Sequence, residues 1–126
     1  MFSRFKIFIV KSNPYHHNNP DWYKKLSEKD IINLNENDYF LLKNNFNLWE
    51  RINEVLSDDT GYMGGPTLGE DTWINKKNEL LRIKQILEGL LKDLNLTSKK
   101  EVNLLSRIYY LVNKAIENGY WLVFDF

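Results

Sequence analysis

Two strand-like segments at opposite ends of the sequence constrain the fold most. The segment Phe5–Lys11 combines β-branched residues with aromatic side chains on both faces of a pleat. Residues 120–126, YWLVFDF, are likewise aromatic and β-branched. Either strand alone would leave an exposed edge that favours aggregation. We therefore expect the two segments to pair in one small sheet, in which the first strand is central because both of its faces are apolar.

The second half of the sequence predicts two amphipathic helices. The first is expected to start at Asp71 or Thr72 and to run to about Leu94. Its apolar residues share one face of about 100°. They are Leu80, Ile83, Leu87, Leu90, Leu91 and Leu94. This stripe predicts a helix packed against the sheet.

The second helix opens with Ser98-Lys99-Lys100-Glu101, which has the spacing of a capping box, and ends at Gly119, a residue suited to the left-handed position after a helix. Leu104 and Leu111 lie opposite its main apolar stripe. Either this helix is covered on two sides, or the two leucines are exposed for a partner such as a second copy of the chain. The main stripe consists of Val102, Leu105, Ile108, Tyr109, Val112 and Ile116.

The region between the strands gives weaker signals. Ser27 is a candidate N-cap, residues 33–37 read as a turn, and residues 39–42 suit either a short strand or a helix start. A further helix is expected from Phe46 to about Ser57. The length of 126 residues suits one domain. The prediction is a single α+β domain over residues 1–126, mainly helical, with a small sheet formed by the N- and C-terminal strands.

The sequence shows no recognisable catalytic motif. It has no Cys, and His16 and His17 are adjacent on a loop, where they would point in opposite directions. The glycine-rich loop 57–71 has no Lys or Arg between residues 52 and 75, so it does not suit a phosphate group. We therefore expect no enzyme activity, no cofactor and no metal. The remaining interpretations of this loop are a flexible connection, a surface for a partner, and a pair of catalytic carboxylates.

The charge distribution is more informative than the total. Lys and Arg number 17, as do Asp and Glu, yet residues 27–71 hold ten acids and three bases. A patch of this sign would face a cationic partner, whose association it would accelerate. Two contact-forming side chains lie among the acids of the loop. The predicted partner-binding residues are Asp58, Asp59, Tyr62, Met63, Glu70 and Asp71.

These features together resemble the small immunity proteins of bacterial contact-dependent growth inhibition and polymorphic toxin systems. The likeness rests on a short, cysteine-free, Asn- and Lys-rich chain with a local acidic tract and no catalytic motif. It implies a cytoplasmic protein that neutralises a cognate toxin domain, often a nuclease, through a basic surface of that toxin. Neither nucleic acid nor membrane would be bound directly.

Two other classes of function remain open. One is a small enzyme that uses the acidic, glycine-rich loop 57–71. The other is a homodimeric adaptor joined through Leu104 and Leu111.

Overall fold

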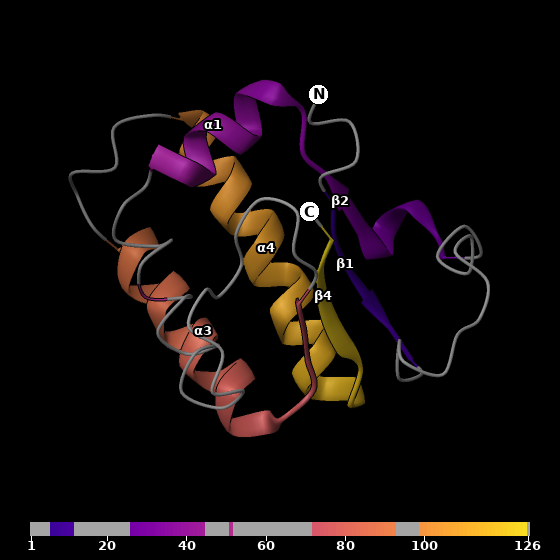
Figure 1. Ribbon diagram of the computed structural model, residues 1–126. Helices are drawn as coiled ribbons and strands as arrows, with labels where there is room; N and C mark the ends of the chain where they lie inside the picture. Colours follow the sequence, from indigo (N-terminus) through magenta and orange to yellow (C-terminus); the bar gives the residue numbers. More distant parts are fainter. Residues whose placement is uncertain (1–5, 12–25, 45–50, 52–71, 93–98, 126) are drawn as a thin grey trace.

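The two terminal strands pair at the centre of a four-stranded antiparallel sheet (Figure 1). The computed structural model describes residues 6–11, 26–44, 51, 72–92 and 99–125. The strands are β1 (Lys6–Val10), β2 (Ile31–Asn33), β3 (Thr72–Ile74) and β4 (Trp121–Asp125), in the order β2-β1-β4-β3. The helices are the short 3-10 helix η3 (Glu28–Asp30) and the α-helices α1 (Glu36–Asn44), α3 (Lys77–Leu91) and α4 (Lys99–Asn118). The predicted α+β class and the pairing of the terminal strands are confirmed.

Both faces of β1 are buried, as its sequence predicts. Ile7 and Ile9 belong to the main core together with Leu122 and Phe124 of β4, on the face against which α4 packs. Phe8 and Val10 form a second apolar cluster with Val123. The alternation along both central strands therefore sends side chains to opposite faces of the sheet.

Helix α4 is covered on two sides, which decides the alternative left open by its sequence. It packs against α3, against α1, and against β1 and β4 of the sheet. Leu104 is 2% exposed and Leu111 is 0% exposed. The alternative of a homodimer contact through these two leucines is therefore wrong, because the chain's own core encloses both side chains.

Helix α3 begins later than its sequence predicts. The segment Thr72–Ile74 pairs with β4 as an edge strand, and α3 starts only at Lys77. The predicted core stripe is otherwise present, with Leu80, Ile83, Leu87 and Leu90 buried and Leu91 partly buried. β-Branched and aromatic residues favour the extended conformation here, where a neighbouring strand is available to pair.

Asn75, between β3 and α3, is hydrogen-bonded to the turn between α4 and β4. Its side-chain amide donates hydrogen bonds to the carbonyl oxygens of Gly119, at 3.0 Å, and Tyr120, at 3.1 Å. Gly119 has a φ of 68°, which confirms its predicted place after α4. The β3–α3 connection is thereby fixed to the turn that leads from α4 into β4.

Residues 39–42 lie within α1, which settles the second open alternative in favour of helix. Asn35 caps this helix, since its side-chain oxygen accepts a hydrogen bond of 2.8 Å from the backbone N–H of Asp38. Of the expected helix from Phe46 only Arg51 is described, and it is helical. The loop 57–71 and Ser98 of the capping box lie outside the described residues, while Lys99, the expected first residue of the helix, is part of α4.

Candidate protein-binding surface

The partner-binding residues predicted from the sequence lie outside the described part of the chain. They are Asp58, Asp59, Tyr62, Met63, Glu70 and Asp71. Their role stays a prediction. The adjacent histidines His16 and His17, for which no site was expected, lie outside the described residues as well. The site is therefore built below from the residues that the structure places.

Four acids of the tract 27–71 lie on either side of the edge strand β2. Glu28 and Asp30 belong to η3 before the strand, and Glu36 and Asp38 belong to the first turn of α1 after it. Glu28 and Glu36 are exposed, and Asp30 and Asp38 are half-buried. We call these four residues the acidic edge. Carboxylates in the first turn of a helix also complement the positive end of its dipole, so α1 can hold them at little cost.

Asp30 is the one member of the acidic edge with a charged partner among the described residues. Its carboxylate accepts a hydrogen bond of 2.7 Å from the Ser27 hydroxyl and pairs with Lys114 of α4 at 3.2 Å. The Ser27 hydrogen bond, and then Lys114, hold the pKa of Asp30 below its ordinary value against an opposing effect of burial. This contact fixes η3 to α4.

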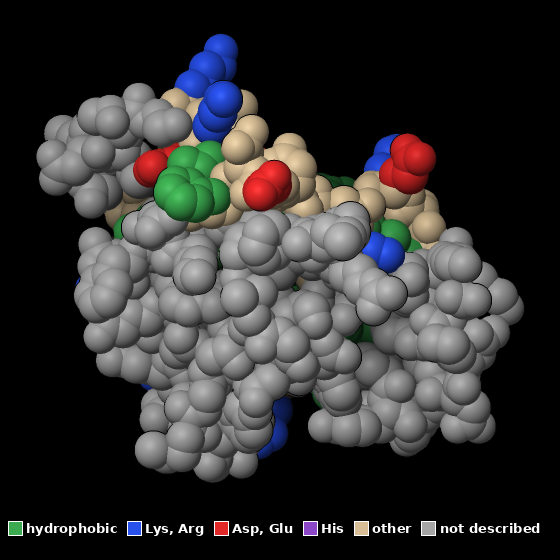
Figure 2. All heavy atoms as spheres, turned by 45° about the horizontal axis from the view of Figure 1, so that its top comes forward, with side chains coloured by type: hydrophobic (Ala, Val, Ile, Leu, Met, Phe, Trp, Pro, Cys, Tyr) green, Lys and Arg blue, Asp and Glu red, His purple; other side chains and the backbone are tan. Residues whose placement is uncertain are grey.

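A large aromatic side chain stands close in sequence to the acids of α1. Phe40, one turn after Glu36, is 65% exposed. Figure 2 shows an exposed hydrophobic side chain between acidic ones on the described part of this face. Aromatic residues are enriched at protein–protein interfaces, whereas an exposed Phe contributes little to folding.

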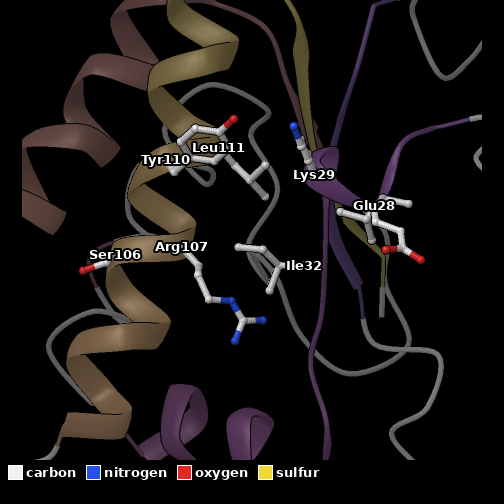
Figure 3. Close-up of a pocket in the computed structure, with 8 residues that line it drawn as sticks. Glu28, Lys29, Ile32, Ser106, Arg107, Tyr110 and Leu111 are labelled. Atoms are coloured by element: carbon white, nitrogen blue, oxygen red, sulfur yellow. The ribbon is translucent and has the colours of Figure 1, made fainter.

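A cleft of about 330 Å³ separates η3 and β2 from α4 (Figure 3). Ile32 and Leu111, both buried, point into it from opposite sides. Tyr110, which is 47% exposed, forms part of the α4 wall, and Arg107 extends from α4 toward the β2 side. The remaining lining residues are Glu28, Lys29, Ile31 and Ser106.

Lys114 holds the ring of Tyr110 at the edge of this cleft. Its ammonium nitrogen lies 5.3 Å from the ring centroid, a cation–π distance. A hydrogen bond with Tyr110, and then the bond with Asp30, raise the pKa of Lys114 above its ordinary value. The aromatic wall of the cleft is thus positioned by the same lysine that joins α4 to η3.

The residue types at these surfaces are common at protein interfaces. Among the residues that the structure describes, no group of three or more His, Cys, Asp and Glu side chains could hold a metal ion. Tyr110 and Arg107 are of the residue types that most often dominate binding energy at interfaces. Within the same ranges, no helix is long and apolar enough to cross a membrane.

Comparison with known proteins finds one whole-length likeness. Neither a family model nor a curated protein sequence matches the chain. The solved structure of the Neisseria DNA mimic protein DMP12 is similar to this chain with a TM-score of 0.67, at 24% identity, over 98% of this chain and 99% of that one. At this identity the likeness shows the fold.

The comparison corrects the expected partner. A toxin domain was expected, with no part for nucleic acid, whereas the solved structure of similar fold is that of a DNA mimic. The expectation of a toxin partner is therefore abandoned, and the homodimer contact through Leu104 and Leu111 falls with it because both residues are buried. The described surface instead presents the acidic edge and, on the same helix as two of its acids, the exposed Phe40.

Proposed function

We propose that this chain binds a nucleic-acid-binding protein at the surface where that protein would otherwise hold DNA, and that it performs no chemistry itself. The observation that carries the proposal is the likeness in fold, over nearly the full length of both chains, to a protein named as a DNA mimic. A toxin has no place in this proposal.

The distribution of charge supports a local form of such mimicry. DNA carries one negative charge for roughly every 1.7 Å of its axis, so a protein that replaces it needs closely spaced carboxylates. With 17 acids and 17 bases, this chain offers them only where its acids are concentrated, in residues 27–71. The described part of that tract is the acidic edge. Helix α3, by contrast, carries Lys77, Arg82 and Lys84, so we expect it to face away from a basic partner.

The exposed Phe40 provides an apolar contact that slows dissociation of the complex, which charge alone does not do. Complementary charge raises the rate of association and selects among partners more than it adds affinity. A buried aromatic anchor lengthens the life of the complex, and its removal costs about 2 kcal/mol or more. Phe40, exposed on the same helix as Glu36 and Asp38, is the described residue best suited to that role.

The experiment uses DNA as a competitor. Proteins from the source cells that bind DNA-cellulose are passed over the immobilised chain, and the retained proteins are identified. We expect a DNA-binding protein to be retained and to be released by short duplex DNA. Retention that duplex DNA does not reverse, or no retention of any DNA-binding protein, would contradict the proposal.

A matched pair of variants locates the surface. The double variant Glu36→Gln/Asp38→Asn removes two charges of the acidic edge while preserving side-chain size. The control Glu88→Gln/Glu117→Gln removes two acids from α3 and α4. We expect only the first variant to weaken retention and to reduce its dependence on salt. Equal effects of both would mean that total charge, and not the acidic edge, determines binding.

A further inference from the structure

The cleft between η3–β2 and α4 has a charge opposite to that of the acidic edge. Arg107 and Lys29 line it, and neither makes an ion pair with a residue that the structure describes. Lys114, the neighbouring base on α4, is already paired with Asp30. Glu28 is the one acid among the lining residues, and its carboxylate is directed away from α4 in Figure 3. The cleft therefore presents two unmatched positive charges.

The interior of the cleft is apolar. Ile32 and Leu111 form its base, and Ile31 and the ring of Tyr110 add to its walls. A volume of about 330 Å³ is near the lower end of the range of roughly 300–1,000 Å³ found for ligand pockets. The space suits one or two side chains of a peptide. An apolar side chain would fill it, and a carboxylate beside that side chain would meet the cations.

We propose that this cleft binds an acidic peptide segment of a protein partner, with one Leu or Phe side chain packed over Ile32 against the exposed ring of Tyr110 and a neighbouring Asp or Glu carboxylate paired with Arg107 and Lys29. Arg107 can hold a carboxylate by two parallel hydrogen bonds, and Lys29 adds a second positive charge. This site adjoins the acidic edge, with which it shares Glu28, and goes beyond the proposed function.

The surroundings favour a peptide over a nucleic acid. A nucleic-acid strand presents a continuous row of phosphates, and its neighbours would meet the carboxylates of Glu28 and Asp30. A peptide with one or two acids places its charge locally and leaves the acids of η3 facing solvent. The apolar base also matches a Leu or Phe side chain better than a charged backbone.

The wall of the cleft is fixed before any ligand arrives. Lys114 lies over the Tyr110 ring at 5.3 Å and pairs with Asp30 at 3.2 Å, which ties α4 to η3 across the site. A pocket whose walls are already ordered loses less conformational entropy on binding. This supports a measurable affinity for a short peptide.

The experiment measures a fluorescent peptide containing one Phe among Asp and Glu residues, by anisotropy with the full chain. The same peptide with Asn and Gln in place of the acids, and a short single-stranded DNA, serve as comparisons. We expect the acidic peptide to bind, and the affinity of the neutral peptide to be lower by roughly tenfold or more. The reason is that hydrogen bonds to charged groups contribute more to the binding free energy than those between neutral groups. Binding of the DNA in preference, or equal binding of both peptides, would overturn the proposal.

Variants then test the two cations. Arg107→Gln and Lys29→Gln should each weaken the acidic peptide several-fold, whereas Lys77→Gln and Lys92→Gln, at exposed positions of α3 and just after it, should leave its affinity unchanged. Methyl NMR of the unaltered chain gives a reading that needs no variant. We expect shifts at Ile32 and Leu111, and shifts confined to other methyl groups would refute the site.

Two further outcomes separate this site from the proposed function. The variant Glu36→Gln/Asp38→Asn should keep the peptide affinity, and Arg107→Gln should keep the capture of DNA-binding proteins. A second copy of the chain could also present acids to the cleft. Concentration-dependent dimerisation that Arg107→Gln abolishes would replace the peptide partner by a second copy and overturn the proposal as stated.

Discussion

Replacing Leu104 by Ala tests the double coverage of α4. Leu104 is 2% exposed and lies in the main core. The change removes three carbon atoms, and about 0.8 kcal/mol for each buried methylene gives about 2.4 kcal/mol. The cavity left in a core that relaxes only in part raises the expected cost to about 3–4 kcal/mol.

The assay is urea denaturation followed by circular dichroism, with Asn103→Ala and Ile108→Ala as references. Asn103 is exposed and Ile108 is fully buried. We expect Leu104→Ala to lower the free energy of unfolding about as much as Ile108→Ala, with an unchanged slope against urea. A loss within about 1 kcal/mol of that for Asn103→Ala would show that this face of α4 is open, and the reasoning from burial would fail.

Three further predictions follow from local geometry. An added Cβ meets nothing within 4 Å at either Gly89 or Gly119, so the backbone conformation alone determines the effect of Ala on stability. Gly89→Ala within α3 should stabilise the fold by about 0.5–1 kcal/mol. Gly119→Ala, at a φ of 68°, should destabilise it by about 1–2 kcal/mol. Thermal melts of both measure this, and a shift of the same sign in each would contradict it. Asn75→Ala should lower the free energy of unfolding by about 1–2 kcal/mol through the loss of two hydrogen bonds. Asn37→Ala, at an exposed position, is the control, and an equal loss in both variants would show that the two hydrogen bonds contribute nothing to stability. Because the pKa of Asp30 is lowered in the fold, its contribution to stability is present above about pH 4 and is lost as the pH falls through the lowered pKa. Asp30→Asn should therefore reduce the loss of stability between pH 5 and pH 2, measured by urea titration at each pH, and an identical acid profile in both proteins would exclude this role.

The central strands were predictable because their sequence pattern is long and specific. Lys6–Val10 and Trp121–Asp125 are five residues each, rich in β-branched and aromatic residues. The edge strands β2 and β3 have three residues each, too few to show an alternation, and their extended form depends on a neighbour to pair with. The start of α3 at Lys77 was missed for the same reason, because residues 72–74 are extended only through their pairing with β4.

The candidate site was harder to predict than the core. Periodicity shows which residues are apolar on one face, but Leu104 and Leu111 are buried only because α4 lies between α3 and the sheet, with α1 against it. The cleft joins residues of η3 and β2 with residues of α4 that are far apart in the sequence. No local pattern indicates that juxtaposition. The acidic tract was visible as a local excess of charge, yet its placement around β2 depends on the fold.

The central place of β4 determines when this protein can acquire its shape. β4 pairs with β1 on one side and β3 on the other, and its pairing joins Lys6 to Asp125. During synthesis β1 is made first among the described elements and β4 last, so β1 waits without one of its two neighbours. Contacts this distant in sequence form slowly, whereas the α3–α4 pair can form from local contacts. The sheet that carries the β2 side of the cleft is therefore complete only after β4 has been made.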